Sequence, residues 1–230
     1  LIERGAVLVD GRTWGTAHKL RAGQEVRLPA LEEERQAAVV PVEGAVLLRE
    51  DGRFAAFNKP AGLHTVTLAG GAGESLEALL PGLCPGRIVT LLNRLDQPTS
   101  GIVLGAFDPE GVRRFKDLED QGLVLKRYLA VVQGVLEGPL VARRGLDTAK
   151  RSKTRLLPED TPDALRWTSA RPLAALDGRT LVEARIAKGA RHQIRAHMAS
   201  AGHPLWGDAL YGGAGEGPLL LHHWRAALDG

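Results

Sequence analysis

The feature that most constrains the fold is a pair of apolar-rich segments joined by the dipeptide Asp177-Gly178. Segments 166–176 and 179–187, RWTSARPLAAL and RTLVEARIA, flank it. Asp-Gly strongly favours a two-residue hairpin turn, because both of its residues adopt positive φ readily. The pattern therefore predicts two long antiparallel strands, and segment 123–133, LVLKRYLAVVQ, predicts a third.

Helical patterns are fewer than strand patterns. Segment 109–121 is the clearest, because Pro109 suits a first turn, apolar residues recur every three or four positions, and Gly122 suits the end. We also expect short helices over 75–80, ended by Pro81-Gly82, and over 190–201, and strands over 53–58, 87–92, 102–107 and 219–224. The predicted fold class is therefore α+β, a mixed and largely antiparallel β-sheet core with packed helices.

Three regions are expected along the chain. Residues 1–28 hold two short strands, in AVLVD and QEVRL, with a turn at Asp10-Gly11, which predicts a small β appendage. Residues 29–45 carry an acidic run and two prolines and are interpreted as a linker, with a charged surface helix over 31–38 as the alternative. Residues 46–230 form the main domain. Because the sequence starts at Leu1 rather than at methionine, we expect further sequence upstream.

The composition limits the class of protein. A single cysteine, Cys84, excludes an internal disulfide and fits a reducing compartment. No apolar run approaches the ~20 residues of a membrane helix, and the first residues lack the pattern of a secretory signal. We therefore expect a cytoplasmic protein without membrane association.

Positive charge is concentrated in one segment. The formal net charge is only +3, yet residues 141–155 hold six basic side chains and one acidic one, a net +5. Such a segment is usually a solvated loop, but on an otherwise neutral chain it is also a candidate contact for a polyanion. The 23 arginines, against 7 lysines, suit bidentate phosphate contacts, although GC-rich coding would also favour arginine. The candidate contacts are Lys150, Arg151 and Lys153.

A polar loop over 93–101, NRLDQPTSG, separates two apolar stretches. Pro98 stiffens this loop, and Thr99 can hydrogen-bond its backbone or a nearby carboxylate. Asp96 therefore has two interpretations, an ordinary turn-forming residue or a carboxylate held near the sheet for chemistry. A phosphatase-type nucleophile is excluded, because Pro98 stands where that motif requires a second carboxylate.

Two further stretches carry candidate residues. In KRYLAVVQG, over 126–134, strand alternation places Tyr128 on the same face as Lys126, where a half-buried tyrosine between core and solvent is the ordinary interpretation. In the expected helix 190–201, Arg191 and Arg195 lie four positions apart and share a face. His192 and His197 lie five apart rather than the four of a zinc-protease helix. No cysteine or glutamate completes a ligand set, so no metal site is predicted.

These stretches resemble a known family when they are taken in order. NRLDQPTSG, KRYLAVVQG and GARHQIRAHMASAGHPLWGDALYGG resemble the signature stretches of the RNA pseudouridine synthases of the RluA type, with FNKPAGLHTV before them and LLLHHWRAAL after them. The likeness covers residues 46–228. The segment AVLVDGRTWGTAHKLRAGQEVRL resembles the second half of an S4 RNA-binding module.

Two positions depart from the family pattern. Asn93 stands where the family usually has histidine, and it keeps a side chain that can hydrogen-bond. The family usually has Thr-Gly-Arg or Thr-Gly-Lys before the His-Gln pair, whereas this chain has Lys188-Gly189-Ala190-Arg191. The basic group has moved by one position, which on a helix rotates it by ~100°.

The resemblance implies an enzyme that converts uridine in RNA to pseudouridine. Because this isomerisation neither adds nor removes atoms, no cofactor is expected. Asp96 would attack ribose C1′ or remove the C2′ proton, Arg195 would pair with it, and Tyr128 would stack on the base or help to remove the C5 proton. The remaining expected substrate contacts are Ile194 beside the pocket and the loop residues Asn93, Arg94 and Thr99.

The resemblance also indicates partners. Structured ribosomal RNA is the expected substrate, because an S4-like appendage suits structured RNA, and transfer RNA is second. No protein partner is implied, so a monomer is expected. The alternative is a catalytically inactive RNA-binding protein of the same fold.

Overall fold

The computed structural model describes residues 8–9, 11–13, 26–27, 44–68, 74–149 and 152–228. The chain divides into two compact units, Leu1–Glu43 and Gly44–Gly230. In the first unit, strands β1 (Leu8–Val9), β2 (Arg12–Thr13) and β3 (Val26–Arg27) form an antiparallel sheet in the order β2-β1-β3. The alternative helix over 31–38 lies outside the described residues.

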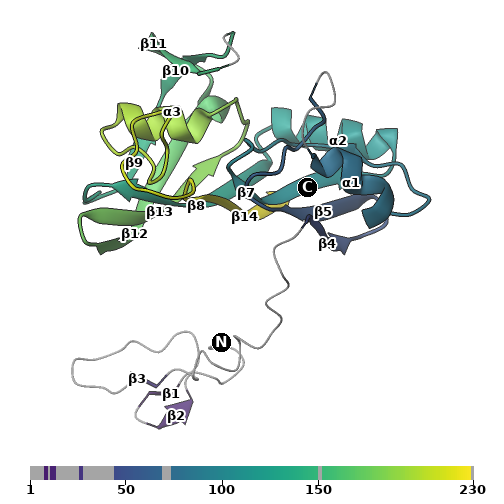
Figure 1. The fold of residues 1–230 in the computed structure, drawn as a ribbon, viewed down its shortest axis with the longest axis horizontal. Helices are drawn as coiled ribbons and strands as arrows, with labels where there is room; N and C mark the ends of the chain where they lie inside the picture. The colour runs from purple at the N-terminus through teal and green to yellow at the C-terminus, as the bar shows by residue number, and fades with distance from the viewer. Residues whose placement is uncertain are drawn as a thin grey trace. The chain divides into compact units, whose positions relative to one another are not determined.

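The second unit is built on one large sheet (Figure 1). Nine strands form it in the order β4-β5-β7-β14-β8-β13-β12-β9, with β6 paired to β7. All described pairings are antiparallel except that of β14 with β7, which confirms the predicted mixed, largely antiparallel sheet. The strands are β4 (Val46–Glu50), β5 (Phe54–Lys59), β6 (Thr90–Leu91), β7 (Ser100–Ala106), β8 (Val124–Gln133), β9 (Leu140–Ala142), β12 (Thr168–Leu176), β13 (Arg179–Ile186) and β14 (Leu221–Leu228).

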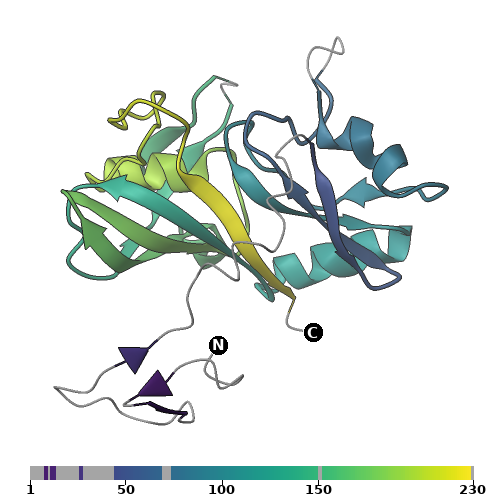
Figure 2. The same ribbon diagram turned by 60° about the horizontal axis from the view of Figure 1, so that its bottom comes forward.

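Helices pack on this sheet, and a short hairpin stands beside it. The helices are α1 (Leu76–Leu83), α2 (Pro109–Asp120) and α3 (Gln193–Ser200), with a 3₁₀ turn, η1 (Ala164–Arg166), and the hairpin consists of β10 (Arg144–Asp147) and β11 (Arg155–Asp160). Residues of α1 and α3 join the larger core cluster, whereas Phe115 of α2 packs in a second cluster with Leu104 and Val124. Figure 2 shows α3 behind the β8–β13–β12 part of the sheet.

Local sequence chemistry accounts for several of these elements. Asp177 and Gly178 both have positive φ, 50° and 70°, so the predicted hairpin of β12 and β13 is confirmed. Helix α2 begins where expected, because the side chain of Asp108 accepts a hydrogen bond from the Gly111 amide. The predicted end of α1 at Pro81 was wrong, since the helix continues through Pro81 to Leu83.

The close approach of β7 and β14 requires glycine. Gly101 has φ +114°, and a Cβ there would lie 2.2 Å from the backbone oxygen of His223. These residues face each other in the single parallel pairing among the described strands. Gly101, which directly follows the loop that carries Asp96, therefore allows β14 to pack beside β7. This pairing joins β4, β5 and β7 to the strands from β8 onward.

Candidate active site

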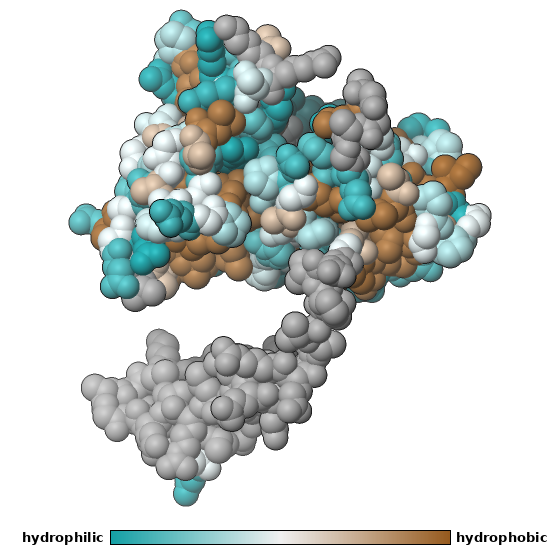
Figure 3. All heavy atoms as spheres, in the orientation of Figure 1, coloured by the Kyte–Doolittle hydropathy of each residue, from teal (hydrophilic) through white to brown (hydrophobic). Residues whose placement is uncertain are grey.

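A cleft of about 970 Å³ opens in the second unit. In Figure 3 the surface is hollowed between the two halves of this unit, and hydrophilic side chains gather there. Four segments contribute to its wall: residues 64–68, the loop 92–98, strand β8 and the turn 189–192. Of the predicted residues, the wall includes Asn93, Arg94, Asp96 and Tyr128.

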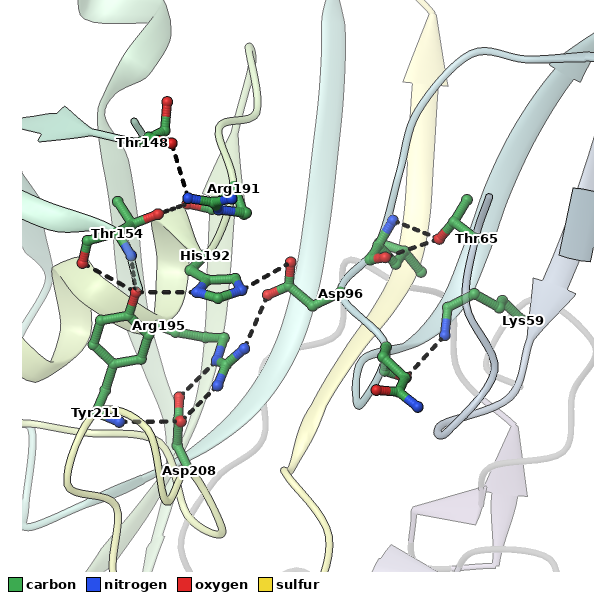
Figure 4. Close-up of polar contacts among 12 residues, drawn as sticks. Lys59, Thr65, Asp96, Thr148, Thr154, Arg191, His192, Arg195, Asp208 and Tyr211 are labelled. Atoms are coloured by element: carbon green, nitrogen blue, oxygen red, sulfur yellow. Dashed lines mark hydrogen bonds and ion pairs between the residues drawn. The ribbon is translucent and has the colours of Figure 1, made fainter. Parts of the chain in front are cut away.

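Hydrogen bonds from Lys59 and Thr65 hold the loop that carries Asp96 (Figure 4). The ammonium group of Lys59, fully buried at the end of β5, donates to the carbonyl oxygens of Gln97 (3.2 Å) and Leu63 (2.7 Å). The Thr65 hydroxyl donates to the Leu95 carbonyl at 2.8 Å and accepts from the Leu95 amide at 3.0 Å. Burial lowers the pKa of Lys59 to about 8, and the Asp96 charge opposes that shift. The backbone on both sides of Asp96 is thereby fixed.

Asp96 contacts Arg195, which lies 99 positions later in the chain, as the family resemblance implied. Arg195 Nη1 lies 3.2 Å from Asp96 Oδ2. The same guanidinium donates to both oxygens of Asp208, Nε to Oδ2 at 2.8 Å and Nη2 to Oδ1 at 2.7 Å. Burial alone would lower the pKa of Arg195, but the two carboxylates outweigh it and raise that pKa, so Arg195 is a permanent cation.

The two carboxylates differ in their access to the cleft. The side chain of Asp208 is fully buried, whereas that of Asp96 is 19% exposed and lines the cleft. Asp208 also accepts from the backbone amides of Leu210 and Tyr211. Asp208 therefore anchors the arginine, and Oδ1 of Asp96, which Arg195 does not bind, remains available to a molecule in the cleft.

His192 lies on the other side of the Asp96 carboxylate. Its Nε2 is 3.8 Å from Asp96 Oδ1, and its Nδ1 is 3.1 Å from the Tyr211 hydroxyl. That hydroxyl accepts from the Thr154 amide and donates to the Thr154 carbonyl. Burial, more than any neighbouring charge, lowers the pKa of His192, which favours a neutral ring.

Tyr128 lies on β8 with its ring against a buried histidine. It is 5% exposed, and its ring is stacked on that of His223 with centroids 4.5 Å apart and 16° between the planes. Burial raises the pKa of Tyr128, and the Asp96 charge adds to that rise. Burial also lowers the pKa of His223 to about 4. The pair is therefore a neutral phenol packed on a neutral imidazole at neutral pH.

Comparisons with known proteins identify the family of this chain. Residues 53–200 match the RNA pseudouridylate synthase family. The chain belongs to this family. It is 32% identical over 218 residues to ribosomal large subunit pseudouridine synthase D of Xanthomonas campestris, covering 93% of this chain and 65% of that protein. It is 31% identical over 255 residues to ribosomal large subunit pseudouridine synthase C of Escherichia coli, covering 96% of this chain and 76% of that protein.

Solved structures support the fold of this family member. Human RNA pseudouridylate synthase domain containing 1 superimposes with a TM-score of 0.66 at 20% identity, covering 81% of this chain and 79% of that one. Human RNA pseudouridylate synthase domain containing 4 gives a TM-score of 0.63 at 21% identity, covering 79% and 83%. At these identities the likeness concerns the fold.

Some predicted substrate contacts lie elsewhere in this pseudouridylate synthase fold. Arg94 is exposed at the cleft, but the Asn93 amide is used inside the protein, where it accepts from the Leu104 amide at 2.7 Å. Thr99 is 2% exposed and lies beneath the loop, with its amide bonded to the Asp96 carbonyl. Ile194 packs in the core, and Ile186 lines the cleft in its place.

The start of helix α3 also differs from the prediction. The helix begins at Gln193, because His192 has a left-handed backbone with φ 54° and ψ 19°. Arg191 therefore lies in the preceding turn and does not share a helical face with Arg195. Its guanidinium donates to the Thr148 carbonyl at 2.8 Å. Lys150 and Arg151 lie outside the described residues, whereas the Lys153 ammonium is 4.9 Å from the centre of the Tyr211 ring.

The sequence did not single out three residues that build the site, Lys59, Asp208 and Tyr211, and it considered His192 only as a metal ligand. Asp208 and Tyr211 lie in the GDALYGG stretch. The only feature there that could have pointed to the site was the aspartate that follows a glycine. Within the described residues, no group of three or more His, Cys, Asp or Glu side chains could hold a metal ion. No helix in that part of the chain is long and apolar enough to cross a membrane.

Proposed function

We propose that this protein converts uridine in RNA to pseudouridine and that Asp96 is its catalytic carboxylate. The carrying observation is the contact of Asp96 with an arginine that a second, fully buried carboxylate holds in place. The paired cation fixes the position of the carboxylate that faces the cleft. An RNA-binding module without catalysis has no use for this arrangement.

The reaction rearranges the bonds of one nucleotide. The bond between ribose C1′ and uracil N1 breaks, a bond between C1′ and C5 forms, C5 loses a proton and N1 gains one. Asp96 either attacks C1′ or removes the C2′ proton, and both routes need the ionised carboxylate that Arg195 stabilises. No cofactor takes part in this balance.

Tyr128 and Arg94 support the flipped nucleotide. The target base leaves the RNA stack, which costs a few kcal/mol. The ring of Tyr128 provides a stacking surface, and its raised pKa means that its hydroxyl carries a proton at neutral pH. Arg94, exposed at the cleft, contacts the RNA backbone or fills the vacated space. Thr99 and Ile194 are buried and do not line the cleft, so they are not proposed as direct substrate contacts.

We further propose large-subunit ribosomal RNA as the substrate, with transfer RNA second. The support is the identity of two relatives, both ribosomal large subunit pseudouridine synthases. Residues 46–230 would carry catalysis, residues 1–28 would act as a partial S4-like RNA contact, and 29–45 would link the two. Lys150, Arg151 and Lys153 would add phosphate contacts.

The deciding experiment maps pseudouridine across total RNA from cells that lack this protein, with complementation by the wild type or by Asp96→Asn. We expect one or more uridines in large-subunit ribosomal RNA to be modified only with the wild type. Modification restored by Asp96→Asn would remove Asp96 from its role. Identical maps with and without the wild-type protein would favour the inactive RNA-binding alternative.

A further inference from the structure

The hydrogen bonds around Tyr211 determine which nitrogen of His192 carries the proton. The Tyr211 hydroxyl has one hydrogen, and the Thr154 carbonyl, 3.1 Å away, can only accept it. The Thr154 amide donates to the same oxygen at 2.9 Å. His192 Nδ1, 3.1 Å from that oxygen, must therefore donate to it. A neutral His192 then has its hydrogen on Nδ1 and a lone pair on Nε2.

This tautomer leaves two acceptors side by side in the cleft. Nε2 of His192 and Oδ1 of Asp96 are 3.8 Å apart, and both residues line the cleft. The charges facing the imidazole are Asp96, Asp208, Arg195 and Arg191, and burial lowers the pKa of His192 more than the carboxylates raise it. A neutral ring cannot form an ion pair with Asp96. A group that donates a hydrogen bond is the natural occupant of the space beside both acceptors.

The backbone of His192 shows that the ring is held there. His192 is one of two non-glycine residues with positive φ among the described residues, with φ 54° and ψ 19°. Left-handed backbone in a non-glycine residue is uncommon and persists where the surrounding structure enforces it. Here the Thr154 and Tyr211 bonds fix the ring edge, and helix α3 starts from the His192 carbonyl. The strain serves to place Nε2 beside Asp96.

We propose that His192 Nε2 is the binding subsite for the 2′-hydroxyl of the target nucleotide. The inference rests on the proposed function, in which Asp96 faces ribose C1′. The 2′-hydroxyl is on the adjacent carbon, so a group beside the Asp96 carboxylate is within its reach. It is also the group by which a protein distinguishes RNA from DNA. His192 is then a substrate-binding residue that selects ribose.

The first test needs no RNA. Nitrogen-15 NMR of the histidine rings in the full chain at pH 7 reports the position of the ring proton, and the His192 signal is the one lost in His192→Asn. We expect a neutral ring protonated on Nδ1. A ring protonated on Nε2, or on both nitrogens, would refute the subsite.

The second test combines a protein change with a sugar change. His192→Asn suits the left-handed backbone and can still donate to Tyr211, but it has no atom at the position of Nε2. The matched control is His203→Asn, because His203 bonds the Gln133 carbonyl through Nδ1 and does not line the cleft. The probes are oligouridylate and the same oligomer built from 2′-deoxyuridine.

Removal of the 2′-hydroxyl should weaken binding to the wild type and to His203→Asn by ~3–10-fold more than binding to His192→Asn, as expected for one hydrogen bond. A purely structural role would lower the affinity for both oligomers equally. Equal sugar penalties in the wild type and His192→Asn, within twofold, would overturn the subsite. If the sugar dependence moves as expected but no pseudouridine forms, the proposed function fails while the subsite stands.

Discussion

Replacing Asp208 with asparagine should destabilise the protein, although Asp208 does not line the cleft. Its fully buried carboxylate accepts two hydrogen bonds from Arg195, at 2.8 and 2.7 Å. Asparagine keeps the size but presents an amide donor to the guanidinium donors. Removing one partner of a buried ion pair costs about 3–5 kcal/mol. Because Asp96 still compensates Arg195 in part, we expect the lower end, a loss of ~3 kcal/mol in the free energy of unfolding.

Urea and thermal unfolding measure this loss. For a domain of this size, ~3 kcal/mol corresponds to a fall of about 6–12 °C in Tm. The matched control is Asp163→Asn, since Asp163 pairs with Arg166 at 3.8 Å on the surface, with 48% of its side chain exposed. An exposed pair contributes about 0–1 kcal/mol, and asparagine can still cap the Leu165 amide.

The same variant tests how Arg195 is positioned. Without the Asp208 carboxylate, the 3.2 Å contact to Asp96 is the remaining ion pair of the guanidinium, whose orientation is then less fixed. We expect the single-turnover rate of pseudouridine formation to fall more than the affinity for RNA. If Asp208→Asn unfolds with the same free energy as Asp163→Asn and keeps the wild-type rate, then Asp208 neither stabilises the fold nor positions Arg195.

Three further predictions concern charge. Asp96→Asn should abolish turnover while RNA affinity stays within a few-fold, because asparagine keeps the size of the side chain and loses its charge. Rapid-quench assays measure the turnover and binding assays the affinity. Near-normal turnover would contradict a catalytic role for Asp96. Neutralising Lys150, Arg151 and Lys153 together should reduce the slope of log affinity against log salt by ~0.7–0.9 per lost phosphate contact, whereas an unchanged slope would mean a solvated loop. The pKa of His223 is lowered by burial from 6.5 to about 4, so stability present above pH 6.5 should fall by about 3 kcal/mol as the pH decreases to 4. His223→Asn should flatten that part of the urea-unfolding profile, and two parallel profiles would show that His223 does not titrate with unfolding.

The parts of the fold that the sequence predicted well depend on local chemistry. The hairpin of β12 and β13 follows from Asp177-Gly178, because a two-residue turn needs positive φ at its turn residues and this dipeptide adopts it readily. Helix α2 follows from its cap at Asp108 and its apolar spacing. The strands β9, β10 and β11 were not predicted, since only three residues of each are paired with a neighbouring strand, too few for a recognisable periodicity.

The site was predictable where one residue pairs with another of opposite charge, and not where tertiary contacts decide. The contact of Asp96 with Arg195 was expected. The second ion pair, of Arg195 with Asp208, was not, because Asp208 lies in a loop whose path no local sequence pattern determines. The left-handed backbone of His192 is likewise set by Tyr211 and Thr154, so helical spacing placed the start of α3 too early.

The division of labour between the two carboxylates explains how the cleft keeps a usable negative charge. Among the side chains that contact Asp96 or Arg195, Arg195 contributes one positive charge, Asp96 and Asp208 contribute two negative charges, and a neutral His192 contributes none. The Lys59 ammonium, bonded to the Leu63 and Gln97 carbonyls, is a further charge that acts on Asp96 without a direct bond to it. Asp208 is fully buried and binds both Nε and Nη2 of the guanidinium, whereas Asp96 contacts only Nη1, so the excess negative charge lies at Asp96, the carboxylate that reaches the cleft. Breaking the bond between C1′ and N1 develops positive charge on the ribose, and a fixed carboxylate beside it stabilises that charge without reorganisation. An arginine bound to Asp96 alone would cancel this charge, so the second carboxylate allows Asp96 to be both ionised and reactive.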